Sequence, residues 1–227
     1  MIAALCGVMF DLFYGVSWTV IGHNLPPASP ALSAVDLAAF YVLHHNAILL
    51  GNALACLFAA MWIPFTAQLA LTMRPIEGDF PVLTIIQVFG GGITSWAFIF
   101  CPAIWAAAAY RPEADPMITQ AMNDTGFFLF NLTYSATSLQ AISAGITGLM
   151  DKRPNPVFPR WVSLWAIFTG FVFVPITLMP FFKTGPFAWD GLVTFWIGFA
   201  AFFVWAASMG TAMMQEIRSR MQTAAAS

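Results

Sequence analysis

Long apolar runs alternate with short joints of proline, glycine and charged residues along the whole chain. A helix needs about 20 apolar residues to cross the hydrocarbon core of a bilayer. The runs lack the period-two alternation of a barrel strand, and lipid cannot satisfy the backbone of an open strand. The pattern therefore predicts an all-α, polytopic transmembrane bundle that forms one domain over residues 1–227. Its six expected spans are residues 2–22, 47–72, 82–109, 125–149, 161–182 and 188–213.

The first run has no basic segment before it and carries Asp11 in its interior. A secretory signal peptide has a positively charged start and an uninterrupted apolar centre. We therefore expect this run to be retained as a span. Asp11 is the one acid within it, and an acid inside a bilayer is costly unless it is paired or faces water.

Composition supports a membrane protein and excludes several other classes. Hydrophobic residues make up 60% of the chain and charged residues 8%, which is far from the composition of a soluble domain. The net charge of −2 leaves no basic stripe for nucleic acid. The lipid bilayer is thus the expected surrounding, and nucleic acid is not an expected partner.

The eight basic residues predict the orientation of the bundle, because cytoplasmic loops carry an excess of lysine and arginine. If both termini are cytoplasmic, Arg111 and Lys183 are the basic residues of the outer face. The inner face then receives the other six, which are Arg74, Lys152, Arg153, Arg160, Arg218 and Arg220. This asymmetry predicts cytoplasmic N and C termini.

Two segments are expected to form a cap outside the apolar core, at residues 24–45 and 112–124. Prolines keep residues 24–33 extended, and Ser33 with Asp36 resembles a capping box that begins a helix. A helix from there to Arg74 would be about 60 Å long, twice the hydrocarbon thickness. It must therefore project from the membrane or break near His44 and His45.

Several motifs resemble an uncharacterised family of six-span bacterial membrane proteins. They lie at residues 26–30 and 111–116, in the FPRW sequence at 158–161, and in FFKTGPFAWDG at 181–191. The resemblance implies a multi-pass protein of the bacterial inner membrane. It implies no activity.

Polar residues at helical spacing predict a ligand pocket in the outer half of the bundle. His45 and Asn52 share one face of the second span, and Asp124 and Asn131 share one face of the fourth, because seven residues are close to two turns. Buried polar groups must meet each other, water or a ligand. The alternative is that the asparagines only join neighbouring helices. The predicted ligand-binding residues are His45, Asn52, Asp124, Asn131, Tyr134 and Trp96.

A second resemblance concerns a possible cofactor. His45 with Asn52, and Asp124 with Tyr134, are similar to groups in membrane-embedded styrene oxide isomerase. That resemblance implies a haem b held by His45 and acting as a Lewis acid. The alternative is that His45 is an interfacial histidine whose nitrogens are satisfied by the protein. No catalytic residue is identified.

Three functions remain open from the sequence. The first is the binding or passage of a small lipophilic molecule, the second is an intramembrane enzyme of isomerase type, and the third is an accessory subunit of a membrane complex. An ion-coupled carrier is less favoured because no inverted repeat is visible. Both a monomer and a homo-oligomer stay open.

Overall fold

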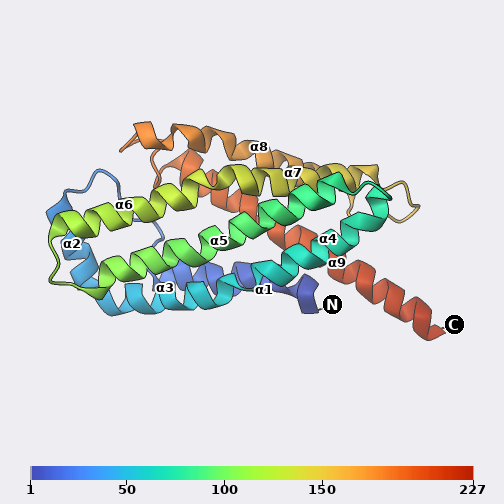
Figure 1. The fold of residues 1–227 in the computed structure, drawn as a ribbon, viewed down its shortest axis with the longest axis horizontal. Coiled ribbons are helices and arrows are strands. Elements are labelled where there is room, and N and C mark those ends of the chain that lie inside the picture. Colours follow the sequence, from blue (N-terminus) through green and yellow to red (C-terminus); the bar gives the residue numbers. More distant parts are fainter. Residues whose placement is uncertain (1, 227) are drawn as a thin grey trace.

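The computed structural model describes residues 2–226, and every regular element in that range is helical. Figure 1 shows long helices packed side by side along one axis. In chain order the elements are α1 (Ile2–Val16), η1 (Ser17–Ile21), α2 (Ala34–Leu43), α3 (His45–Ala59), α4 (Trp62–Glu77), α5 (Val82–Tyr110), α6 (Pro116–Leu132), α7 (Tyr134–Met150), α8 (Arg160–Val172), η2 (Val174–Phe181), η3 (Leu192–Ile197) and α9 (Gly198–Ala226).

Five helical stretches are long and apolar enough to cross a membrane. They are Ile2–Ile21, His45–Glu77, Val82–Tyr110, Arg160–Phe181 and Leu192–Thr223. The predicted all-helical fold with several apolar spans is confirmed. The remaining predicted span, at 125–149, falls on α6 and α7, which meet at Thr133 and have 17 residues each.

The bundle has two distinct ends (Figure 1). The termini end holds both chain termini and the loops at 78–81 and 151–159. The cap end holds α2 and the loops at 22–33, 111–115 and 182–191. Arg111 and Lys183 lie in the cap-end loops, while the other six basic residues lie in helix ends or loops at the termini end.

Local chemistry explains where several helices begin and end. Ser33 caps α2, accepting a hydrogen bond from the Asp36 amide at 3.2 Å, as predicted. Asp115 caps α6 and is followed by Pro116, whose missing N–H is harmless in a first turn. Gly78 ends α4 with a φ of +81°, a conformation that glycine adopts without steric cost.

The predicted break of the long second helix occurs at His44. Its backbone leaves helical geometry with φ −105° and ψ 14°, so α2 and α3 are separate helices. Hydrogen bonds then join the cap-end segments to the bundle. The Tyr41 hydroxyl donates to the Asn123 side chain at 3.0 Å, and the Trp189 indole donates to the Ala28 carbonyl at 2.8 Å.

The core is built from aromatic side chains around α1. Phe10 stacks on Tyr14 at 4.6 Å and contacts the rings of Trp62 at 4.9 Å and Phe98 at 4.8 Å. These four side chains are almost fully buried. Since lipid tails are as apolar as the core, such dense packing is what favours helix association over lipid contact.

Small residues allow close contact between α4, α5 and α7. A Cβ atom at Gly91 would lie 2.5 Å from the Gln140 amide nitrogen and 2.5 Å from the Thr66 hydroxyl. Gln140 donates to Thr66 at 3.2 Å and accepts from the Trp62 indole at 3.3 Å. Interhelical hydrogen bonds therefore surround a glycine that has no room for a side chain.

Candidate functional site

A partly open cavity of about 70 Å³ lies between the helices of the bundle. Its walls come from α1, α5, the junction of α6 with α7, the junction of α8 with η2, and the junction of η3 with α9. Ala97, which forms one wall, lies near the middle of the apolar helix α5. The cavity is therefore remote from both ends of the bundle.

Three of these walls depart from regular α-helical geometry. The backbone is interrupted at Thr133, the segment after Phe173 is a 3₁₀ helix, and the segment containing Thr194 is a π-helix. All three residues line the cavity. Irregular backbone at membrane depth is tolerated where it is buried in protein or lines a cavity, and π-helical turns are frequent at functional sites.

Aromatic rings form most of the cavity surface. Phe98 lies 5.5 Å from Phe202 and 5.9 Å from Phe130, measured between ring centroids, and Phe130 lies 6.1 Å from Phe199. Beyond the lining, Trp18 stacks on Phe130 at 5.2 Å and on Phe199 at 5.3 Å. Stacked rings make this wall rigid and apolar.

Five polar side chains face this apolar space. Thr133 donates to the Leu129 and Phe130 carbonyls at 3.0 Å, a pattern that satisfies its hydroxyl within the helix. The other four are Tyr14, Asn131, Tyr134 and Thr194. None of the described residues that line the cavity is charged, so the site excludes a charged ligand unless it brings its own counterion.

Two of the predicted ligand-binding residues, Asn131 and Tyr134, line the cavity. Asn131 is buried and its amide nitrogen donates to the Phe127 carbonyl at 2.9 Å. The Tyr134 hydroxyl bonds the Thr177 hydroxyl, which joins α7 to η2. The break at Thr133 thus brings both residues to one wall.

The other four predicted residues lie away from the cavity lining. The His45 Nδ1 lies 2.7 Å from the Ala109 carbonyl oxygen. Asn52 is fully buried on α3 and donates to the Ile48 carbonyl at 2.8 Å. Asp124 accepts from Asn123 at 3.2 Å, and Trp96 is 41% exposed on the outer surface of α5. The structure does not gather the six residues around one space, and their role in binding stays a prediction.

The surroundings of His45 do not fit a haem. Its Nδ1 is bonded to a carbonyl, which would leave Nε2 for a metal. However, His45 does not line the cavity. No chemical step is derived through a haem.

Sequence reasoning missed Tyr14, which lines the cavity from α1. It is 2% exposed, and its hydroxyl has no hydrogen-bond partner in the described part of the chain. Its spacing of four from Phe10 is the one signal that placed both rings on a common helix face. That spacing does not distinguish a cavity wall from a face that contacts lipid.

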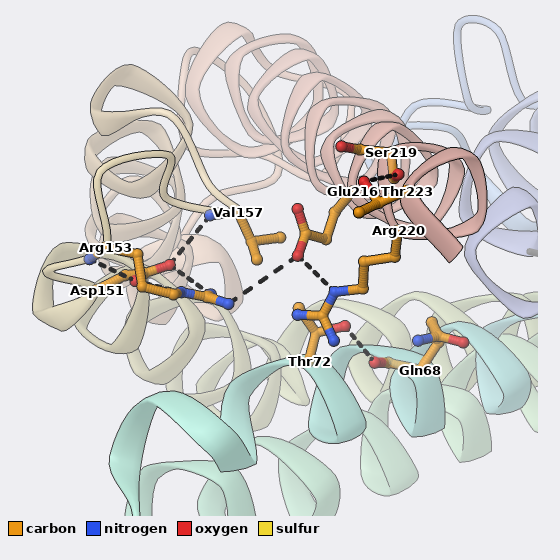
Figure 2. A network of polar contacts seen from close by, with 9 residues as sticks. All are labelled: Gln68, Thr72, Asp151, Arg153, Val157, Glu216, Ser219, Arg220 and Thr223. Carbon is orange, nitrogen blue, oxygen red and sulfur yellow. Dashed lines mark hydrogen bonds and ion pairs between the residues drawn. The ribbon is translucent and has the colours of Figure 1, made fainter. Parts of the chain in front are cut away.

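A second polar group lies at the termini end and forms an ion network (Figure 2). Asp151 accepts from the Arg153 guanidinium at 2.7 and 2.6 Å, and Glu216 accepts from Arg220 at 2.6 Å. The hydrogen bond from Arg153 lowers the pKa of Asp151 to about 2. The Arg153 guanidinium also lies 4.0 Å from the Glu216 carboxylate, so we interpret this network as a structural tie between the 151–159 loop and α9.

Comparison with known proteins gives no indication of function. No protein-family model, no curated protein and no solved structure matches this chain. The resemblance to a six-span bacterial family therefore stays a prediction.

Proposed function

We propose that this chain is a six-span protein of a bacterial inner membrane that binds a small lipophilic molecule in the cavity. The observation that carries the proposal is that the interruption at Thr133, the 3₁₀ segment and the π-helix all meet at one uncharged, aromatic-lined space. Helices that only pack against each other gain nothing from three such departures at one point.

Binding inside a bilayer sets a particular requirement on the site. Lipid tails are as apolar as phenylalanine, so burial of apolar surface alone gives a ligand little reason to leave the lipid. Affinity must come from fit to rigid walls and from a few placed polar groups. The stacked rings and the five polar side chains of the cavity meet both needs.

The entrance we propose lies between α7 and η2. Tyr134 lines the cavity, its hydroxyl bonds the Thr177 hydroxyl, and Thr177 is exposed. Breaking one hydrogen bond costs about 1 kcal/mol, which thermal motion supplies readily. A ligand would then enter sideways from the lipid rather than through the cap end.

We also propose that both termini of the bundle face the cytoplasm. The six basic residues at the termini end favour cytoplasmic termini, which requires that α6 and α7 together form a sixth span. Reporter fusions in the 78–81 turn and in the 182–186 turn are expected on opposite sides of the membrane. Two reporters on the same side would contradict this arrangement.

Native mass spectrometry in lipid nanodiscs tests the binding function. A Cβ atom at Gly198 would meet its nearest neighbours, Phe173 and Val193, at 3.8 Å, so Gly198→Leu fits the backbone and fills the cavity. Gly92→Leu is the control, because Gly92 is exposed and nothing lies within 4 Å of its Cβ position. We expect a small bound mass in the wild type and in Gly92→Leu that Gly198→Leu lacks. Equal bound mass in all three would refute the site.

A further inference from the structure

An open hollow with polar walls lies at the termini end of the bundle. It has a volume of about 580 Å³ and lies between the 151–159 loop and the last turns of α9. Thr223 lines it, but the Thr223 hydroxyl donates to the Ser219 carbonyl at 3.1 Å. The lining also includes exposed side chains that carry hydrogen-bond donors, namely Arg153, Asn155, Ser219 and Arg220. These donors are within reach of a molecule outside the protein.

One carboxylate oxygen holds the two arginines close together. The Arg220 Nε donates to Glu216 Oε1 at 2.6 Å, and the Arg153 Nη1 lies 4.0 Å from the same oxygen (Figure 2). The Arg220 side chain is 64% exposed and the Arg153 side chain is 39% exposed. A guanidinium group has several N–H donors, and within residues 2–226 Arg220 uses only its Nε. Its terminal nitrogens are thus free to bind another acceptor.

The charges at this end of the bundle favour an anion. Asp151 engages Arg153 and Glu216 engages Arg220, so the network itself is balanced. The termini end as a whole holds six basic residues against four acids, which are Glu77, Asp79, Asp151 and Glu216. An exposed ion pair between residues four apart on a helix is weak, so Arg220 can turn towards a stronger acceptor. Guanidinium groups match the oxygens of a phosphate in geometry and charge.

The hollow lies at the depth of the lipid headgroups. The stretch Leu192–Thr223 has 32 residues, about 45 Å of helix, whereas the hydrocarbon core is about 30 Å thick. Glu216 is the first charged residue of α9, and Arg220 follows one turn later. The end of α9 therefore reaches the headgroup layer, where the phosphates of the membrane lipids are concentrated.

We propose that this hollow binds the phosphate group of an anionic phospholipid. Arg153 and Arg220 donate to the phosphate oxygens, Asn155 and Ser219 contact the headgroup, and the acyl chains stay in the bilayer. A zwitterionic lipid carries a cation beside its phosphate, and the basic residues of the termini end repel that cation. This site is independent of the cavity between the helices.

Native mass spectrometry of the detergent-solubilised protein tests the site with added dioleoyl phosphatidylglycerol, and with dioleoyl phosphatidylcholine as the zwitterionic counterpart. We expect the wild type to prefer phosphatidylglycerol. Arg220→Gln should weaken that binding about tenfold, because it removes one charge-assisted contact. Arg218→Gln is the matched control, since Arg218 is exposed on the same helix and lies outside the lining. It makes the same change of charge and should alter the affinity by less than about twofold.

Other results would overturn the proposal. Equal losses in Arg220→Gln and Arg218→Gln would assign the binding to overall charge rather than to the hollow. Equal binding of the two lipids by the wild type would contradict the preference for an anionic lipid. Inorganic phosphate, added at the concentration of the lipid, is expected to leave phosphatidylglycerol bound. If it displaces the lipid, free phosphate is the ligand and the lipid is not.

Hydrogen exchange of the wild type removes any dependence on how the variants fold. A bound headgroup would contact both the 151–159 loop and the end of α9. Amides of residues 151–159 and 216–223 should therefore exchange more slowly in nanodiscs of phosphatidylglycerol than in nanodiscs of phosphatidylcholine. The cap-end loop at 111–115 is the internal reference. Unchanged exchange at the termini end, or equal slowing in the reference loop, would overturn the site.

Discussion

Replacing Gly91 by alanine is expected to destabilise the bundle, although alanine is the better helix former. The added methyl group would lie 2.5 Å from atoms of Gln140 and Thr66, closer than carbon atoms approach one another. Both side chains belong to the hydrogen-bonded contact among α4, α5 and α7. The helices must separate, or Gln140 must move and break its bonds.

The size of the effect follows from the competing contributions. Overpacking of a dense interior costs about 1–3 kcal/mol. Loss of one hydrogen bond of Gln140 adds about 1 kcal/mol, and the gain in helix propensity offsets up to about 1 kcal/mol. The expected net loss is about 1–3 kcal/mol.

Gly92→Ala is the internal control for this prediction. Gly92 is the next residue of α5, and nothing lies within 4 Å of its Cβ position. It should therefore gain up to about 1 kcal/mol from propensity alone. Unfolding of both variants by titration with a denaturing detergent, followed by tryptophan fluorescence, gives the difference. Equal stability of Gly91→Ala and Gly92→Ala would refute the packing argument.

A double variant locates the cause. Gln140→Ala removes the side chain that the new methyl group would strike. In that background Gly91→Ala should cost less than it does alone, because residues in contact show coupling of about 0.5–3 kcal/mol. Additive losses would indicate that the two sites do not touch.

Three other perturbations test the ends of the bundle. Asp151→Asn removes the partner of Arg153. As the pH falls below about 3.9, the unfolded pKa of Asp151, towards its folded pKa of about 2, the wild type should therefore lose more stability than the variant. Thermal unfolding across this range measures the difference, and matching profiles would contradict it. Burial lowers the pKa of His23, so the cap end should weaken as the pH falls below the unfolded value of about 6.5. Faster hydrogen exchange in residues 22–33 at acid pH would report this, whereas constant exchange would argue against it. Trp189→Phe removes the hydrogen bond to the Ala28 carbonyl and should cost about 1 kcal/mol in the same unfolding assay, with no loss expected if that bond is absent.

Sequence reasoning succeeded where the signal is local. Apolar length identifies the five helical stretches that are long enough to cross a membrane, and the hydroxyl of Ser33 identifies the start of α2. Length alone left two alternatives for the second helix, projection from the membrane or a break near His44 and His45, and the structure shows the break at His44. Each of these features depends on residues close together in the chain.

The cavity could not be predicted in this way. Helical spacing assumes an ideal helix of 100° per residue, but the interruption at Thr133 separates Tyr134 from the helix that carries Asp124. The π-helix at 192–197 changes the register of α9 in the same manner. The sequence also does not show which helices are neighbours. In the structure α3, which carries His45 and Asn52, packs against α5 and η1 rather than α6 and α7. Hydrophobic periodicity reveals neither where a helix is interrupted nor which helices are neighbours.

The pairing of the first helix with the last determines the order in which the bundle can assemble during synthesis. Trp18 in η1 stacks on Phe199, Phe10 of α1 contacts Phe202, and Ala28 is held by Trp189. A ribosome that has already released α1 into the membrane must still translate η3 and α9 before these contacts exist. Until then lipid or the insertion machinery covers the aromatic face of α1. The cavity is therefore completed only after η3 and α9, which follow its other walls in the chain, have been translated.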